Sequence, residues 1–268
     1  MLPNSQAQDA AEEELSPFEK LGWVTEGEAD LGKWARIQIP DGFGYLDAKD
    51  TVKLMEMFGN LETGREVGML MHLEEEWFVI YEFDEVGYVK DDEKDDLDAD
   101  KLLKQKQEGQ EAANDYRVDQ GMEPMFVTGW IKEPFYNEES NNLEWGIKVK
   151  SGDSESANYL TKLLGRRGVM DATLVCNPEE MATVLPEFRT QLAGYEYVDG
   201  QQYAQFSDGD KIAKYGLTAL VVGAGATLAA KAGLFAVIGK FFAKAWKLVV
   251  VAVVGVVAAF KRLFGGGR

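Results

Sequence analysis

Residues 159–176 read YLTKLLGRRGVMDATLVC, and this stretch decides the fold. Two apolar runs, Tyr159–Leu164 and Val169–Cys176, flank the tetrapeptide Gly165-Arg166-Arg167-Gly168. Short apolar runs on either side of a glycine-containing turn are typical of a β-hairpin. The stretch therefore predicts two antiparallel strands joined at a basic tip, and this tip is the one cationic cluster in the acidic part of the chain.

Further strands are predicted on the N-terminal side of this hairpin. Trp34–Pro40 alternates apolar and polar residues and runs into the turn Pro40-Asp41-Gly42. Two apolar runs lie on either side of the three glutamates at residues 74–76, and two alternating runs lie on either side of a polar tip at residues 138–142. Each pair is expected to form antiparallel strands. These four runs are Val67–Leu73, Trp77–Phe83, Phe126–Ile131 and Leu143–Lys150.

Three helices are predicted between the strands. Asp50–Phe58 has apolar residues three apart, and Asp98 can cap a helix from Ala99 to about Asp119. A third, amphipathic helix starts near Pro178 and continues to about Leu192 despite Pro186 inside it. The predicted fold class is α+β rather than doubly wound: an antiparallel sheet with helices on one face, plus a C-terminal helical membrane hairpin.

Charge is segregated along the chain. The formal net charge of -18 combines +9 from the segment that begins at Lys211, which has seven Lys, two Arg and no acid, with -27 from residues 1–210. An acidic body repels phosphate backbones, so nucleic acid is not an expected partner of the soluble part. We predict a mobile acidic lead-in at residues 1–17, an acidic α+β soluble domain at 18–208 and a basic membrane anchor at 209–268.

The C-terminal part has the composition of a membrane anchor. Ile212–Ala230 spans 19 residues with Lys214 as its one charge, which suffices to cross a hydrocarbon core about 30 Å thick. Leu248–Phe260 is equally apolar but has 13 residues, so two crossings, or one crossing and a helix in the near leaflet, both remain open. We favour two crossings over one and over a buried globular hairpin. The predicted membrane-anchoring residues are Tyr215, Leu217, Leu220, Val221, Val222, Leu228, Trp246, Val250, Val253 and Val257.

Small and basic residues predict two further roles for the anchor. Gly225, Ala229 and Gly233 recur every four residues, which would let a second helix approach closely in lipid, although an Ala/Gly-rich composition explains the same stripe. Lysines interspersed with Phe and Trp suit an interfacial helix on anionic lipid. The predicted lipid-headgroup residues are Lys231, Lys240, Lys244, Lys247, Lys261 and Arg262.

No constellation in the sequence predicts catalysis. Asp91–Asp100 is rich in carboxylates but lacks the glycine and the closing glutamate of a calcium loop, so we favour a solvated turn with a helix cap. Acid pairs at Glu74–Glu76 and Glu138–Glu144 are expected by chance among 46 acidic residues. His72 and Cys176 are interpreted as structural. We therefore predict no catalytic residue, no metal site and no cofactor.

Four short motifs carry a resemblance to a known family. They are Ile39-Pro40-Asp41-Gly42, Asp98-Ala99-Asp100-Lys101-Leu102-Leu103, Asn141-Asn142-Leu143-Glu144-Trp145 and Lys214-Tyr215-Gly216-Leu217. In this order they resemble a family of uncharacterised prokaryotic membrane-anchored proteins, catalogued as a domain of unknown function. The resemblance implies a signal peptide and an acidic domain outside the cytoplasm; this chain departs from it because Met1–Ser16 has no apolar core. The family supplies no catalytic residues.

Together these features predict a non-enzymatic binding or scaffold domain held at a bacterial membrane surface. The expected partners are the lipid bilayer and a protein, or a second copy of the chain through the anchor. The expected location is the bacterial inner membrane, with the soluble domain on its extracytoplasmic side. Two alternatives stay open: a hydrolase that uses two carboxylates, and a subunit of an oligomeric membrane assembly built on the small-residue stripe.

Overall fold

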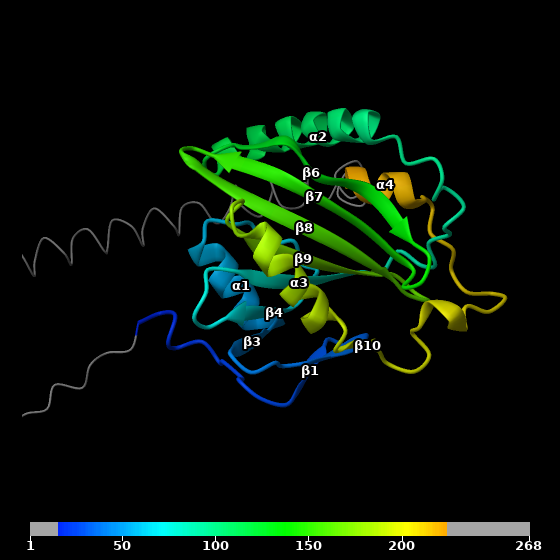
Figure 1. The fold of residues 1–268 in the computed structure, drawn as a ribbon, viewed down its shortest axis with the longest axis horizontal. Helices are drawn as coiled ribbons and strands as arrows, with labels where there is room; N and C mark the ends of the chain where they lie inside the picture. The colour runs from blue at the N-terminus through cyan, green and yellow to red at the C-terminus, as the bar shows by residue number, and fades with distance from the viewer. Residues whose placement is uncertain (1–15, 224–268) are drawn as a thin grey trace, which may run out of the picture. The chain divides into compact units, whose positions relative to one another are not determined.

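A seven-stranded antiparallel sheet forms the centre of the protein (Figure 1). The computed structural model describes residues 16–223. Neighbouring strands follow the order β3-β4-β5-β9-β8-β7-β6. Their bounds are β3 Phe43–Asp47, β4 Glu66–His72, β5 Phe78–Asp84, β6 Met125–Asn137, β7 Asn142–Ser151, β8 Ser154–Leu164 and β9 Val169–Cys176.

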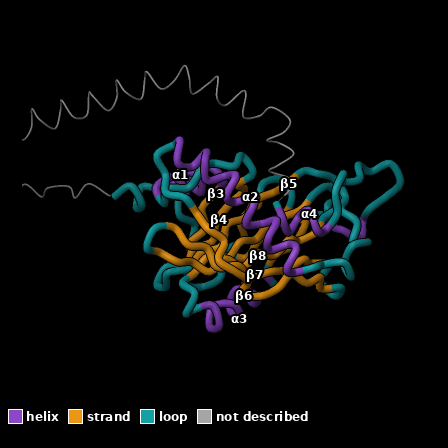
Figure 2. The backbone as a smooth tube through the Cα atoms, turned by 90° about the horizontal axis from the view of Figure 1, so that it is seen from above, coloured by secondary structure: helices purple, strands orange, loops and turns teal. Residues whose placement is uncertain are grey.

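Helices cover both faces of this sheet (Figure 2). Helices α1 (Ala48–Met57), α2 (Ala99–Asp119) and α4 (Leu217–Val222) pack on one face, and α3 (Met181–Leu192) packs on the other. A small antiparallel sheet in the order β1-β2-β10 also packs on the α3 face. Its strands are β1 Glu28–Leu31, β2 Ala35–Gln38 and β10 Tyr195–Tyr197, and a short 3-10 helix, η1, follows at Tyr203–Gln205.

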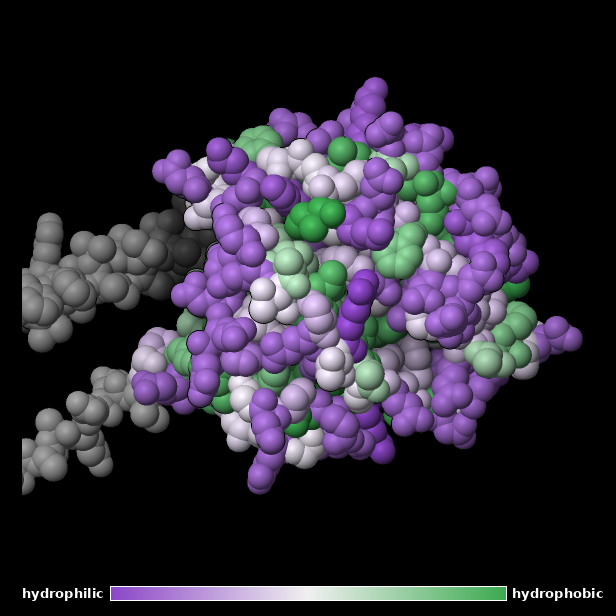
Figure 3. Space-filling view, viewed as in Figure 1, coloured by the Kyte–Doolittle hydropathy of each residue, from purple (hydrophilic) through white to green (hydrophobic). Residues whose placement is uncertain are grey.

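The prediction that the helices lie on one face is wrong, because the central strands bury both of their faces. Along β9, Met170, Ala172 and Leu174 enter the core under α3, while Val169 enters the core under α2 and α4. A strand buried on both faces needs cover on both. Figure 3 shows that the outer surface on the side viewed there is mostly hydrophilic, in keeping with the acidic composition.

The local predictions around residues 159–176 are confirmed. Strands β8 and β9 pair antiparallel from Ala157↔Cys176 to Leu164↔Val169, with the glycine-flanked tip between them. Helix α2 spans Ala99–Asp119, and the Asp98 carboxylate accepts a hydrogen bond from Lys101 N at 3.0 Å. Helix α3 continues through Pro186, as its hydrophobic spacing predicts.

The C-terminal helical membrane hairpin of the predicted fold is also corrected. The first predicted crossing, Ile212–Ala230, is not one helix over its described part: Ile212 bridges Tyr88, and α4 has six residues. No helix within residues 16–223 is long and apolar enough to cross a membrane. The second predicted crossing, Leu248–Phe260, lies outside the described residues. The first crossing does not form because Glu93 binds Thr218 and the Tyr88 carbonyl binds Ala213 N, which holds the start of the apolar segment on the domain.

Candidate functional site

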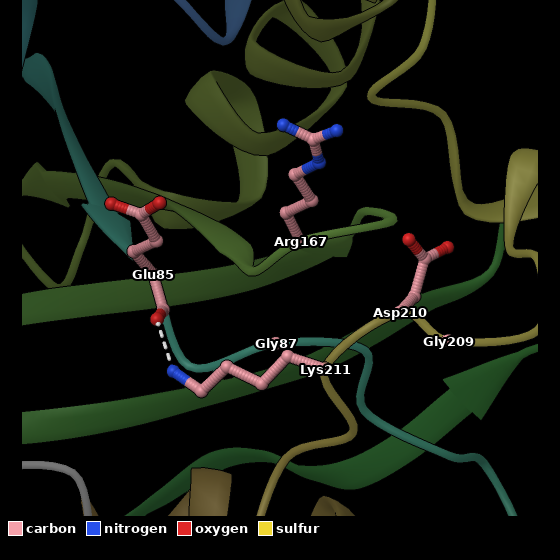
Figure 4. A pocket seen from close by; sticks show the side chains of 6 residues that line it. All are labelled: Glu85, Gly87, Arg167, Gly209, Asp210 and Lys211. Carbon is pink, nitrogen blue, oxygen red and sulfur yellow. Dashed lines mark hydrogen bonds between the residues drawn. The ribbon is translucent and has the colours of Figure 1, made fainter.

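A pocket of about 470 Å³ opens beside the basic tip of the β8–β9 hairpin (Figure 4). We call it the hairpin-tip pocket. The segment after β5 and the chain that leads to α4 supply its other walls, so it joins three segments far apart in the sequence. It is lined by Glu85, Gly87, Arg167, Gly209, Asp210 and Lys211.

Backbone contacts fix the position of the hairpin tip. Gly165 N donates to Gly168 O at 2.9 Å, which closes the turn, and Gly87 N donates to the carbonyl of Arg167 at 3.0 Å. Arg166 N donates to Gln201 O at 2.8 Å on the other side. Gly168 has no room for a side chain, because a Cβ there would overlap the backbone oxygen of Asp84. The tip is therefore held in one place rather than projecting as a free loop.

The two arginines of the tip have different electrostatic roles. Arg166 binds Asp210 through two hydrogen bonds, Nε to Oδ2 at 2.7 Å and Nη2 to Oδ1 at 3.0 Å. The hydrogen bond from Arg166, aided by the backbone N–H of Ser207, lowers the pKa of the Asp210 carboxyl. The guanidinium of Arg167 makes no hydrogen bond or ion pair within residues 16–223, and in Figure 4 it stands clear of the carboxylates of Glu85 and Asp210.

The remaining cation of the pocket is anchored at its side. The Lys211 ammonium donates to the backbone oxygen of Glu85 at 3.0 Å, the dashed contact in Figure 4. Gly87 adopts a φ of 101°, a backbone conformation that favours glycine, where the chain passes close to the Lys211 carbonyl. The pocket thus presents one free guanidinium and one ammonium, with a rim that carries two carboxylates.

A row of charged side chains crosses the middle of the sheet on the face that carries α1, α2 and α4. Lys162, Asp171 and Glu82 lie directly opposite one another on β8, β9 and β5. Lys162 Nζ donates to Asp171 Oδ2, and Arg65 lies 3.3 Å from Glu82 and 3.9 Å from Asp171. We call Arg65, Glu82, Lys162 and Asp171 the charge row. Its two acids are each matched by a cation.

Lys106 of α2 extends the charge row toward α4. Its ammonium donates to Val221 O at 3.1 Å and lies 5.5 Å from the centre of the Trp145 ring. Burial, followed by repulsion from Lys162, lowers the pKa of Lys106 to about 8. Burial also raises the pKa of Glu82. The hairpin-tip pocket is lined by other residues, so we interpret the charge row as an internally neutralised structural cluster.

The acid pairs and the histidine named in the sequence occupy structural positions. Glu74–Glu76 form an exposed turn between β4 and β5. Glu144 is buried, accepts a hydrogen bond from Tyr159 OH at 2.7 Å and lies 3.5 Å from Arg189. The Nδ1 atom of His72 accepts hydrogen bonds from Glu74 N and Glu75 N, which orders that turn.

The acidic run before α2 serves as a turn and a cap. Asp98 caps α2, and Glu93 accepts hydrogen bonds from the backbone N–H and the hydroxyl of Thr218 at 2.9 and 2.6 Å. Within residues 16–223, no group of three or more His, Cys, Asp or Glu side chains is arranged to hold a metal ion. Cys176 is buried, and burial raises the pKa of its thiol to about 11.

Half of the predicted membrane-anchoring residues lie in the described part of the chain, where they pack against the domain. Leu217, Leu220 and Val221 are buried in the core beneath α2, and Tyr215 and Val222 pack against that core. Tyr215 OH also donates to Asp84 at 3.2 Å. The predicted anchoring residues from Leu228 on, the small-residue stripe and the lipid-headgroup residues lie outside residues 16–223, and their roles stay predictions.

Sequence reasoning identified the basic tip but missed the charge row. A signal was present, because residues 162 and 171 are equally far from the Gly165–Gly168 tip and must face each other if the hairpin forms. Arg65, Glu82 and Lys106 gave no such signal, since they reach the row from the loop before β4, from β5 and from α2.

Comparisons with known proteins give a family and distant structural likenesses. A family model described as "Protein of unknown function (DUF2167)" matches residues 24–254. No curated protein matches the chain significantly. Among solved structures, the chain is similar to the solution structure of cyanobacterial PsbP (CyanoP) from Synechocystis sp. PCC 6803, with 14% identity and a TM-score of 0.42. That alignment covers 65% of this chain and 94% of the other.

Proposed function

Since the chain belongs to the DUF2167 family of proteins of unknown function, we propose a role from its site: a non-catalytic binding module that holds an acidic group in the hairpin-tip pocket. One observation carries the proposal. Within residues 16–223 the Arg167 guanidinium makes no hydrogen bond or ion pair, and its charge acts on Asp210 only at longer range, whereas Arg166, Arg65 and Arg189 are each paired with a carboxylate. A guanidinium suits a carboxylate, which it can bind through two hydrogen bonds.

The chemistry of the pocket limits what it binds. Lys211 adds a second positive charge, while Glu85 and Asp210 at the rim disfavour a ligand with several negative charges. A single carboxylate on a protein partner, such as an exposed acidic side chain, fits this balance. The proposal therefore favours a weak protein contact over capture of a polyanion.

A carboxylate hydrolase has less support. Glu82 and Asp171 are neighbours across β5 and β9, as two catalytic acids would be, but Arg65 and Lys162 neutralise them and α4 packs on the same face of the sheet. A general acid and a nucleophile need access to a substrate. Of the acids that line the hairpin-tip pocket, Glu85 is exposed, while Asp210 is half-buried and paired with Arg166.

The test of the proposal is a titration of the full chain with acetate. Binding is monitored by NMR of 15N-labelled arginine side chains. We expect the Nε–Hε signal of Arg167 to shift saturably, with a dissociation constant on the order of millimolar, because one solvated ion pair contributes little. Arg167→Gln should weaken the accompanying shifts of the Gly87 and Gly168 amides about tenfold.

The matched control is Arg36→Gln. Arg36 is exposed and paired with Glu28 and Asp30, far from the lining of the pocket. This variant should leave the acetate titration unchanged. A titration that Arg167→Gln does not alter, or one that Arg36→Gln alters equally, would refute the proposed site.

We also propose that this module works at a bacterial membrane surface, on the extracytoplasmic side of the inner membrane. The basic, acid-free composition after Lys211 and the family resemblance support this placement. Protease added to spheroplasts should then cleave the acidic domain, whereas the same protease added to inverted vesicles should leave it intact. Protection in spheroplasts with cleavage in inverted vesicles would reverse the proposed side.

A further inference from the structure

A second pocket, of about 400 Å³, lies between the β6–β7 turn, the end of β8, the end of α3, β10 and η1. We call it the tyrosine pocket, after its three tyrosines. It is lined by Ser140, Asn141, Asn142, Leu163, Leu164, Leu192, Ala193, Tyr195, Glu196, Tyr197, Gln202, Tyr203 and Ala204. Its volume falls within the range of small-molecule sites.

The lining of this pocket excludes the ligand class proposed for the hairpin-tip pocket. It contains no Lys, Arg or His, and its single charge is the carboxylate of Glu196. An anion would find no countercharge there. Leucines, alanines and tyrosine rings form an apolar wall, and side-chain amides supply donors and acceptors. The composition suits a neutral ligand that has both an apolar surface and hydrogen-bonding groups.

The tyrosines form fixed walls because two of their hydroxyls are engaged elsewhere. Tyr197 OH donates to Leu163 O at 2.7 Å and accepts from Met170 N at 3.1 Å. Tyr203 OH donates to Val89 O at 3.1 Å, and its ring stacks on Tyr88 with 4.5 Å between centroids. A ligand therefore meets aromatic carbon that is already in position, without the cost of ordering these side chains.

Asn142 is the polar group that points to a ligand. Its residue is 9% exposed and lines the pocket, yet its side-chain amide has no hydrogen-bond partner within residues 16–223. The amide nitrogen and oxygen are not themselves fully buried, so they face the solvent of the pocket and are available to a ligand. Its neighbour Asn141, held at a φ of 53°, accepts a hydrogen bond from Tyr136 OH at 3.3 Å, which orders the turn beside it.

We propose that the tyrosine pocket binds a neutral N-acetylated amino sugar. A side-chain amide can pair with an acetamido group through two hydrogen bonds, N–H to carbonyl oxygen in each direction, and Asn142 is free to do so. Leu163 and Leu164 supply apolar surface for the acetyl methyl group. The hydroxyl of Ser140, which has no partner within the described residues, accepts a hydrogen bond from a sugar hydroxyl.

The experiment compares two disaccharides on the full chain by isothermal titration calorimetry. N,N′-diacetylchitobiose should bind, whereas cellobiose, which has hydroxyls in place of the acetamido groups, should bind at least about tenfold more weakly. Asn142→Asp keeps the shape of the side chain but removes its donor, and it should weaken binding of diacetylchitobiose about tenfold or more.

The matched control is Asn137→Asp. Asn137 lies opposite Asn142 at the same turn, and its Oδ1 atom accepts from Glu139 N, an interaction that aspartate retains. This variant should bind like the parent chain. Saturation-transfer NMR on the parent chain gives a readout that needs no variant: the acetyl methyl protons should receive the strongest saturation. Equal binding of cellobiose, no binding of either sugar, or equal loss in both variants would overturn the proposal.

Discussion

Replacing Asp171 by asparagine should lower the free energy of unfolding by about 3 kcal/mol, because it removes the acid that holds the charge row together. Asp171 is 4% exposed, pairs with Lys162 and lies 3.9 Å from Arg65. Asparagine keeps the shape but leaves two partly buried cations without their common anion. Urea-induced unfolding of the full chain, followed by tryptophan fluorescence, measures the change.

Two further variants separate this effect from a general sensitivity of the sheet. Asp153→Asn, in the exposed turn between β7 and β8, should change the free energy of unfolding by less than about 0.5 kcal/mol. Replacing both partners, Lys162→Met with Asp171→Leu, should recover part of the loss, since an apolar pair of similar volume needs no countercharge. A single Asp171→Asn variant as stable as the Asp153→Asn control would contradict this account of the charge row.

Lys106→Met should remove a rise in stability that the parent chain shows between pH 7 and about pH 9.5. The pKa of Lys106 is about 8 in the folded protein, below its value of about 10.4 in an unfolded chain. In this window the unfolded state binds more protons, so the free energy of unfolding increases with pH. We expect a gain of about 1 to 2 kcal/mol, the lower figure allowing for the partial exposure of the side chain.

The comparison is made by urea unfolding of both proteins at each pH. Subtracting the two curves cancels the tyrosines and the exposed lysines, which titrate in both. Lys104→Met is the matched control, because Lys104 lies on the same helix but is exposed and pairs only loosely with Glu108 at 3.9 Å. If the Lys106→Met and parent curves stay parallel over the whole window, Lys106 is charged throughout and the assignment fails.

The parts of the fold that follow from local pattern could be predicted. The hairpin at residues 159–176 and the helix capped by Asp98 depend on alternation, a glycine tip and a capping side chain, all of which are adjacent in the sequence. The two-sided cover of the sheet was missed, although the almost unbroken apolar run around Val169–Cys176 is typical of a strand buried on both faces.

The segment at Ile212–Val222 could not be predicted from its own residues. Its apolar composition fits a lipid environment and a protein core equally well. What decides between them is remote: Glu93 binds Thr218, and Tyr88 accepts a hydrogen bond from Ala213 N. The same applies to both pockets, whose walls come from segments that are neighbours only after folding.

The attachment of α4 has a mechanical consequence. Tension applied at Val222, the end of α4, acts first on the hydrogen bond at the Val221 carbonyl, then on those at Thr218, and then on the pairing of Ile212 with Tyr88. A pull on the end of α4 therefore loads these contacts first, and α4 should peel from the core before the rest of the domain is stretched.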